Sequence, residues 1–360
     1  MTRPILTGAI GPHAWFNGKE ILYFGGNNYL GIAGRPELAA AAASAIRRYG
    51  ASVGASRETS GTSDLHLQLE QRLAAWKDTE DVCVYASGYL GNLILLRALL
   101  NPDDTVICDR GVHPSVLDGI PRSIKAVHFY EHHDMDDLKR VIQKVKQGIV
   151  IVNGVETVSG EIAPLDRILE IVFDRRFRVV VDDAHATGVL GENGRGTPEH
   201  FGINSPHVYQ TETMSKALGS FGGFISSNRQ LCDRIRQVSA YIGSTTLPPS
   251  VVGASIASVE TLMKEPQLRE RLKANAQYMA SRLNDLGLTV RWHGTPIVSF
   301  DEAYGDTGEK IHKILLEHSI LVPLIRYPTA DSPGRLRLTV SAGHSKEDID
   351  RFYDIVKRYG

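Results

Sequence analysis

The chain has 360 residues, of which 42% are hydrophobic and 22% are charged, a composition typical of a globular protein with a sizeable core. Because single hydrophobic cores stop growing near about 250–300 residues, this length predicts two packed units. Lysine and arginine together number 40, and aspartate and glutamate 41. The resulting net charge of −1 gives no overall field that would draw the protein to nucleic acid or to an anionic membrane.

The sequence also argues against a membrane-spanning, secreted or disulfide-bonded protein. It contains no apolar stretch near the roughly 20 residues needed to cross a bilayer, and residues 1–20 lack the apolar segment of a secretory signal. The three cysteines, Cys83, Cys108 and Cys232, are odd in number and show no CxxC spacing. We therefore predict a cytoplasmic protein with no disulfide framework, no cysteine-based zinc site and no other metal centre.

Short apolar runs alternate with helical patterns in the first half of the chain. Runs bounded by turn residues predict strands buried on both faces of a parallel sheet, at residues 82–85, 105–109, 126–130, 149–155 and 179–184. Helical patterns lie between them, at residues 93–100, 134–145 and 165–176. This alternation predicts an α/β fold over residues 36–255, with a mostly parallel sheet and helices on both faces. Ligands of such sheets bind beyond the carboxyl ends of the strands.

The pattern changes after Pro248 and Pro249. A long helical stretch over residues 249–286, interrupted near Pro266, leads into short strand and helix patterns that end in a helix over residues 346–359. This change predicts a smaller α+β C-terminal domain over residues 256–360. Residues 1–35 show two weak strand patterns and no helix, and are predicted to form a separate N-terminal segment.

Lys216 differs from the other lysines because its neighbourhood, TETMSKALGSFGGFI, is nearly uncharged and rich in small residues. A lysine without an obvious solvated face is expected to be buried, and burial lowers the pKa of its amine toward that of a nucleophile. A lysine that forms a Schiff base needs such an amine. From the local sequence alone, an ordinary loop lysine between two strands is an equal alternative.

A second candidate lies in VVVDDAHATGVLGENGRG, where a strand ends in two acids and His185 follows Asp182 by three residues. The pair could bind a metal, exchange protons or anchor a cofactor, but no third metal ligand is near in sequence. A cofactor with a pyridine nitrogen would need a carboxylate there to keep that nitrogen protonated. A capped strand end with a hydrogen-bonded histidine is the alternative without a function.

The third candidate is YASGYLGN at residues 85–92, in which a strand, a Ser-Gly turn and a helix follow one another. Backbone amides at the start of that helix, aided by the helix dipole, would hold a phosphate. The motif is neither a Walker sequence nor a dinucleotide fingerprint, so by itself an ordinary turn is favoured. However, the chain order of phosphate site, acid, histidine and buried lysine is that of a fold-type I pyridoxal phosphate (PLP) enzyme.

Nine motifs extend this interpretation from about Gly25 to the C-terminus. In chain order they are NNYLG, SGTSDLHLQLEQRLAAW, SGYLGN, DRGVHPSVLDG, SGEIAPL, DDAHATGVLGENGRG, TMSKALG, GSTTLPP and RLRLTVSAGH. With these motifs the chain resembles the α-oxoamine synthases, the PLP enzymes that join an amino acid to an acyl thioester. The resemblance implies a fold-type I PLP-dependent transferase.

The resemblance also implies roles for individual residues. Lys216 would bind PLP as a Schiff base and move the Cα proton, Asp182 would pair with the pyridinium nitrogen, and His185 would hydrogen-bond the phenolate oxygen. His113 would stack on the ring, although nothing in its local sequence distinguishes it from the other histidines. The remaining implied cofactor contacts are Ser87, Gly88, Tyr89, Thr213 and, from the neighbouring subunit of a homodimer with shared active sites, Ser244 and Thr245.

Substrate contacts follow from the same resemblance. Asn28 matches a residue of the substrate pocket, and Arg337 matches the arginine that holds the substrate carboxylate, a role suited to its fork of donors. Asn153 stands where the family usually carries an acid, and Glu156 where an aromatic residue or histidine is common. The short N-terminal segment and the absence of a basic cluster leave both acyl-CoA and an acyl carrier protein as thioester donors.

The implied reaction is the condensation of a small amino acid with an acyl thioester, usually followed by loss of CO2. An 8-amino-7-oxononanoate synthase is the main expectation, supported by IRYPTADSPGRLRLTVSAGH at residues 325–344. Glycine C-acetyltransferase (2-amino-3-ketobutyrate CoA ligase) is the nearest alternative, because of SRETSGTSDLH. Asn153 keeps open an enzyme that acts on the amino acid alone, such as an aminotransferase, racemase or decarboxylase. The presence of Lys216, Asp182, His185 and His113 argues against a protein without catalysis.

Overall fold

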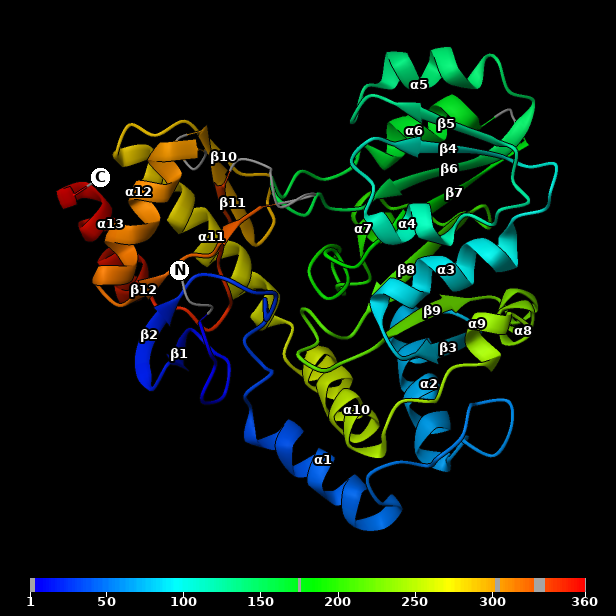
Figure 1. The fold of residues 1–360 in the computed structure, drawn as a ribbon, viewed down its shortest axis with the longest axis horizontal. Helices are drawn as coiled ribbons and strands as arrows, with labels where there is room; N and C mark the ends of the chain where they lie inside the picture. Colours follow the sequence, from blue (N-terminus) through cyan, green and yellow to red (C-terminus); the bar gives the residue numbers. More distant parts are fainter. Residues whose placement is uncertain (1–3, 174–175, 302–304, 327–333, 360) are drawn as a thin grey trace.

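The computed structural model describes residues 4–173, 176–301, 305–326 and 334–359. Figure 1 shows a large sheet with its helices on the right and a smaller group of short strands and helices on the left. Helices α1 (Pro36–Tyr49) and α10 (Pro249–Lys264) lie side by side at the bottom of this view, between the two groups.

A seven-stranded sheet forms the larger group, in the order β3-β9-β8-β7-β6-β4-β5. All neighbouring strands are parallel except the pairs that include β9. In β6 the run from Ile149 to Val152 is fully buried, as expected for a central strand that is covered on both faces. The strands are β3 (Asp81–Tyr85), β4 (Thr105–Asp109), β5 (Ala126–Tyr130), β6 (Gln147–Asn153), β7 (Arg176–Asp182), β8 (Val208–Thr213) and β9 (Gly223–Ser227).

Helices cover both faces of this sheet. One face packs against a cluster of helices that includes α3 (Gly88–Leu99), α4 (Pro114–Gly119) and α8 (Arg229–Arg236). The other face packs against α5 (Met135–Ile142), α6 (Leu165–Val172) and, further along the sheet, α2 (Asp64–Lys77) and α10. Two short helices complete this part, α7 (Thr197–His200) and α9 (Ser239–Ile242).

The smaller group is built from short strands around a separate core. Strands β10 (Val290–Arg291), β11 (Ile297–Phe300) and β15 (Leu338–Thr339) form one antiparallel sheet, and β13 (Leu324–Ile325) pairs with β14 (Arg335–Leu336). The N-terminal β1 (His13–Phe16) and β2 (Lys19–Tyr23) join β12 (Ile320–Leu321). Helices α11 (Gln267–Asp285), α12 (Gly305–Glu317) and α13 (Lys346–Tyr359) pack on the core, which includes Leu22 and Phe24.

These observations confirm the predicted fold class, an α/β sheet that is mostly parallel, with helices on both faces and a smaller α+β part. Strands β4 and β5 and helix α13 begin and end at the predicted residues. The pairing of β2 with β12 was not predicted, and it links the N-terminal segment to the C-terminal core. The division into residues 1–35, 36–255 and 256–360 stays a prediction. Within the described residues, no helix is long and apolar enough to span a membrane.

Candidate active site

The carboxyl ends of three neighbouring parallel strands carry the candidate site. Strand β6 ends at Asn153, β7 at Asp182 and β8 at Thr213, and Asn153 lies beside Asp182 in the sheet. A cavity of about 220 Å³ opens at this edge. The residues that line it are Gly88, Tyr89, His113, Ser115, Asn153, Val155, Thr157, Asp182, Ala184, His185, Thr213, Ser215 and Lys216.

Asp182 is held by amide groups. Its Oδ2 accepts a hydrogen bond from Nδ2 of Asn92 at 2.7 Å, and its Oδ1 accepts one from the backbone amide of Ala184 at 3.2 Å. The hydroxyl of Thr211 orients Asn92, donating to its Oδ1 at 2.9 Å. No described lysine or arginine forms an ion pair with Asp182, so the carboxylate can pair with a positive charge inside the cavity.

His113 forms one wall of the cavity as a neutral ring in a fixed orientation. Its Nδ1 accepts from the backbone amide of Ser115 at 3.3 Å and lies 2.8 Å from the Ser115 hydroxyl oxygen. Because Asn92 donates to that hydroxyl oxygen at 2.8 Å, the hydroxyl proton points to His113, which assigns the ring proton to Nε2. Burial lowers the pKa of His113. The Oδ1 of Asn153 also accepts the backbone amide of His113 at 3.2 Å.

His185 connects the cavity to the smaller core through Tyr29. Its Nδ1 lies 2.7 Å from the Tyr29 hydroxyl, which accepts from Nη2 of Arg337 at 3.1 Å. The Tyr29 hydroxyl also donates to Asn27 Oδ1 at 3.3 Å, so it lies in one hydrogen-bond network with His185, Asn27 and Arg337. Burial, followed by the positive charges of Lys216 and Arg337, holds the pKa of His185 well below its usual range. His185 is thus a neutral imidazole at neutral pH.

Lys216 lies in the loop between β8 and β9 and has an activated amine. Burial lowers its pKa to about 8, the charge of Asp182 opposes this shift, and the charge of Arg337 adds to it. The amine makes no hydrogen bond to any residue that the structure describes. Gly222, at φ +92° within the same loop, accepts through its carbonyl oxygen from the backbone amide of Met214, which closes the loop around Lys216.

The start of helix α3 provides an anion site on the edge of the cavity. Ser87 caps the helix, its hydroxyl oxygen accepting the backbone amide of Leu90 at 3.4 Å. A Cβ at Gly88 would lie 3.3 Å from the Thr213 side chain, so glycine keeps the first turn of the helix open. Free amides and the helix dipole at such an N-terminus favour a phosphate. Tyr89 hydrogen-bonds Asp118 and meets His113 edge to face.

The donor set fits PLP. The amine of Lys216 would bind the aldehyde of that cofactor, and the carboxylate of Asp182 would pair with its pyridine nitrogen. The N-terminus of α3 would bind its phosphate. His113 would supply a flat surface for the ring. Two features support the fit independently of any motif: Asp182 lacks a positive partner, and Lys216 lacks a hydrogen bond among the described residues.

Five of the predicted site residues do not line this cavity: Asn28, Ser87, Ser244, Thr245 and Arg337. The side chain of Asn28 stabilises its own loop, where its Oδ1 accepts a hydrogen bond from the backbone amide of Ala33 at 3.2 Å. The Ser244 hydroxyl donates to the Ala240 carbonyl at 2.6 Å, and Thr245 pairs with Ser56 in an isolated bridge. Arg337 is also outside the lining, but its hydrogen bond to Tyr29 connects it to His185. In the segment at residues 325–344, residues 327–333 lie outside the described part.

The two departures from the family pattern have local roles. The Nδ2 of Asn153 donates to the Gly111 carbonyl at 2.7 Å, and its Oδ1 accepts from the backbone of His113. An amide can donate and accept in this way, whereas an ionised acid could only accept. Glu156 folds back on its own turn and accepts the backbone amide of Val158 at 2.6 Å. Glu156 is not among the residues that line the cavity.

Four residues that contribute to the site were not singled out from the sequence. Asn92 and Ser115 connect Asp182 to His113, Tyr29 connects His185 to Arg337, and Ser215 lines the cavity beside Lys216. Each lies inside a motif that carries the resemblance, respectively SGYLGN, DRGVHPSVLDG, NNYLG and TMSKALG. Only their positions within these motifs could have indicated a role in the site, since polar residues are common at the ends of strands and helices.

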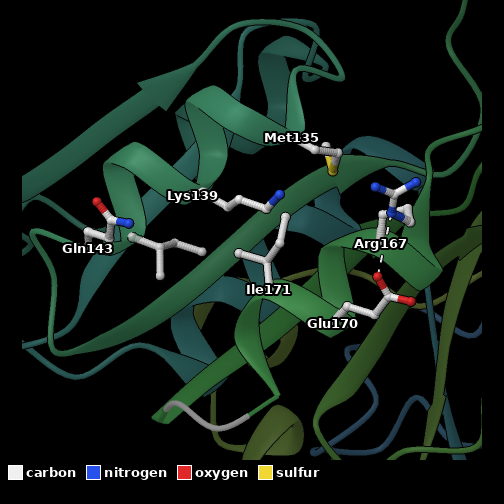
Figure 2. Close-up of a pocket in the computed structure, with 7 residues that line it drawn as sticks. Met135, Lys139, Gln143, Arg167, Glu170 and Ile171 are labelled. Carbon is white, nitrogen blue, oxygen red and sulfur yellow. Dashed lines mark ion pairs between the residues drawn. The ribbon is translucent and has the colours of Figure 1, made fainter.

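A separate shallow hollow of about 180 Å³ lies between α5 and α6 (Figure 2). In it Arg167 and Glu170 form an ion pair at 3.5 Å, and the nearby Lys139 pairs with Asp136 at 3.3 Å. These are exposed pairs between neighbouring turns of a helix, which contribute little energy. The hollow contains no group with an evident chemical role.

The fold and the site define an α/β enzyme of the PLP class, with a buried lysine in the loop after β8. Comparison with known proteins agrees, because residues 19–356 match the family described as aminotransferase class I and II. The chain belongs to this family and, within it, to the α-oxoamine synthases.

The similar proteins span nearly the whole chain. It is 36% identical to 8-amino-7-oxononanoate synthase 1 of Bacillus subtilis over 97% of this chain and 90% of the relative. It is 36% identical to 8-amino-7-oxononanoate synthase of Alkaliphilus metalliredigens over 99% and 92%. A serine palmitoyltransferase structure from S. paucimobilis, with bound PLP–myriocin aldimine, superposes with a TM-score of 0.92 at 28% identity, over 99% of this chain and 92% of that one.

Proposed function

We propose that this protein is a PLP-dependent acyltransferase that condenses a small amino acid with an acyl thioester and has 8-amino-7-oxononanoate synthase activity. The grouping of Lys216, Asp182, His113 and His185 around one cavity carries the proposal. The relatives support the choice of reaction, because proteins of that name are 36% identical over at least 97% of this chain.

The product named for these relatives suggests which substrates to test first. In 8-amino-7-oxononanoate the ketone is at C7 and the amine at C8 of a nine-carbon acid. Cutting the bond between C7 and C8 leaves a seven-carbon dicarboxylic acyl group and a two-carbon amine fragment. Alanine supplies that fragment: its Cα forms the new bond to the acyl carbonyl carbon, which releases the thiol of the thioester, and its carboxyl group leaves as CO2. Alanine and a heptanedioyl thioester are therefore the proposed substrates.

The chain's own residues provide orientation and proton transfer. PLP supplies the electron sink that makes the amino acid's Cα proton removable. Lys216 would bind the cofactor and, once displaced by the substrate amine, take the Cα proton; a pKa of about 8 leaves part of it unprotonated at neutral pH. Asp182 would hold a proton at the pyridine nitrogen, and His185 would hydrogen-bond the phenolate oxygen. His113 would cover one face of the ring.

Arg337 is the proposed anchor of the substrate carboxylate. Arg337 is 9% exposed, and its guanidinium donates to neutral oxygens: the Thr157 carbonyl at 2.8 Å, Asn27 Oδ1 at 3.0 Å, the Tyr29 hydroxyl at 3.1 Å and the Gly26 carbonyl at 3.4 Å. No acid among the described residues neutralises this buried cation. A carboxylate that enters the cavity would do so with charge-assisted hydrogen bonds. Asn28 stays a proposed neighbour of the substrate.

The experiment that tests the proposal is a spectral titration of the PLP-loaded protein, followed by product analysis. Alanine, glycine and serine are added in turn, each followed by heptanedioyl-CoA or the heptanedioyl carrier protein. We expect alanine to perturb the cofactor band most, and 8-amino-7-oxononanoate, CO2 and free thiol to form in equal amounts. Acetyl-CoA with glycine as the preferred pair would instead identify glycine C-acetyltransferase. Turnover of the amino acid without any thioester would contradict the acyltransferase proposal.

A homodimer with shared sites is the proposed assembly. Ser244 and Thr245 lie outside the cavity of their own chain, and Thr245 is exposed, which leaves them available to the phosphate in a partner's site. A cytoplasmic location stays a prediction; all three cysteines are free and buried, as a reducing compartment would permit.

Mixed dimers test the sharing of sites. Lys216→Ala removes the amine, and Thr245→Asp places a negative charge against the phosphate, so each homodimer is expected to be inactive. Equal mixing after co-expression should restore about a quarter of the normal activity, because half of the dimers are mixed and each has one intact site. Mass spectrometry verifies that mixed dimers formed. Inactive mixed dimers would contradict a site built from two subunits.

A further inference from the structure

A second cluster of ligand-type side chains lies outside the cavity, where strands β4 and β5 end. Asp109 is the last residue of β4, and His132 and His133 follow β5 in the turn that leads into α5. Ligand atoms from these three side chains lie within 4.8 Å of one another. None of the three has a role in the proposed reaction.

His133 is a buried imidazole whose Nε2 has no partner among the described residues. Its side chain is 8% exposed, and both nitrogens are buried without a hydrogen-bond partner in the described structure. Glu161 Oε1 lies 3.3 Å from Nδ1, within ion-pair distance but outside hydrogen-bond geometry. A buried polar group left in this state is destabilising, so its presence calls for an explanation such as a bound ion.

The backbone directs both histidine rings to the same side. Adjacent residues of an extended chain point in opposite directions, but His133 adopts φ +54°, the left-handed region, and reverses this arrangement. The two rings consequently stack, with centroids 3.9 Å apart and planes 28° from parallel. The left-handed conformation is uncommon for a residue other than glycine. Here it gathers two imidazoles beside one carboxylate.

Asp109 is an oriented anionic partner for them. Its side chain is 1% exposed, and its Oδ1 accepts from the backbone amide of Gly111 and from Nδ1 of His132, both at 2.6 Å. The backbone amide of His133 donates to Oδ2 at 2.9 Å. The carboxylate is therefore fixed in place before any ion arrives. His132 and Glu161, with side chains 34% and 42% exposed, leave a path from solvent.

We propose that Asp109, His132 and His133 bind a divalent transition-metal ion, specifically Zn²⁺, and that the side chain of Glu161, which lies beside His133 but outside the three-residue cluster, turns in to complete the set as the fourth ligand. Two imidazoles and two carboxylates are a donor set that zinc accepts in tetrahedral geometry. On binding, His132 gives up the Nδ1 proton that it shares with Asp109 and carries its ring proton on Nε2, and the ligand atoms separate to surround an ion about 2 Å from each. The expectation of no metal centre considered only cysteines and the surroundings of Asp182 and His185.

Such an ion would stiffen one wall of the active site. The amide of Gly111 donates to Asp109, and His113, the proposed ring-stacking residue, lies two residues further along the same loop. The ion would affect this loop through Asp109. With four protein donors it would be a structural ion, and it would not take part in the proposed condensation.

Cobalt binding to the PLP-loaded, metal-stripped protein tests the proposal. Co²⁺ is titrated and followed by its visible absorption at wavelengths longer than those of PLP, and elemental analysis after dialysis gives the zinc content. We expect one ion per chain, a spectrum typical of four-coordinate cobalt, and displacement by Zn²⁺. Absence of saturable binding up to about 1 mM metal would overturn the proposal.

Two variants locate the ion, with a matched histidine control. His133→Asn keeps a residue that tolerates the left-handed region, and we expect it to weaken Co²⁺ binding at least about 100-fold, more than the loss of an outer-shell partner. Glu161→Gln should alter the cobalt spectrum and weaken binding to a smaller extent. His128→Asn changes an exposed histidine of β5 and should leave binding unchanged. Equal affinities in His133→Asn and the original protein would overturn the assignment.

Discussion

Replacing Lys216 with alanine is expected to abolish the visible absorption of bound PLP and to lower turnover by on the order of 10⁴-fold or more. The amine lies at the cavity with a pKa lowered to about 8, and no other lysine lines that cavity. Without it, the cofactor has no covalent attachment and the Cα proton has no base. The absorption spectrum and product formation from alanine and heptanedioyl-CoA measure the two effects separately.

Two controls separate chemistry from folding in that experiment. Lys125→Ala removes an exposed lysine ahead of β5 and should change neither the spectrum nor the rate. Lys216→Arg keeps the positive charge beside Asp182 but cannot form the imine at neutral pH, and it should be as inactive as the alanine variant. A normal spectrum that borohydride still reduces in Lys216→Ala would mean that another lysine binds the cofactor.

Changing Asp182 to asparagine is expected to leave PLP bound but to slow turnover by about 10²- to 10³-fold, the effect of losing one oriented electrostatic contact in an active site. The carboxylate has no cation partner among the described residues, so its charge is available to keep the pyridine nitrogen protonated. Asparagine retains the size and one hydrogen bond but lacks the charge. Cofactor content and turnover are measured on the same sample.

A cofactor analogue gives a sharper control than a second substitution at Asp182. N-methyl PLP carries a permanent positive charge on the ring nitrogen, so it should restore a large part of the rate in Asp182→Asn. Asn92→Ala keeps the Asp182 charge and removes only the 2.7 Å hydrogen bond to Oδ2; we expect a smaller loss, about 10-fold. Unchanged turnover in Asp182→Asn would refute the role of its charge.

The sequence could predict the parts of the site that depend on strand ends. Asp182 follows a run of valines that could only be a buried strand, and strand β7 ends there. The uncharged surroundings of Lys216 made it a candidate on equal terms with an ordinary loop lysine, and Lys216 does line the cavity. Local composition carried these inferences because the carboxyl ends of parallel strands meet at one edge.

Contacts across long chain separations could not be derived in this way. Tyr29 and Arg337 are 308 residues apart, and Tyr29 and His185 are 156 apart, so no local pattern indicates that they meet. The pairing of β2 with β12, which links the N-terminal segment to the C-terminal core, was equally hidden, because β12 has only two residues. His133 was overlooked for a related reason, because its conformation, rather than its neighbours in sequence, aligns it with Asp109.

Arg337 also links two segments that are far apart in the sequence. Its Nε–H is bonded to Thr157 of the segment after β6, while its other nitrogens bond to Gly26, Asn27 and Tyr29 of the segment after β2. A guanidinium has five N–H donors, and these contacts engage four of them. If Arg337 holds the substrate carboxylate as proposed, a carboxylate that takes two donors would release one of these contacts and so weaken the link between the segments after β2 and β6.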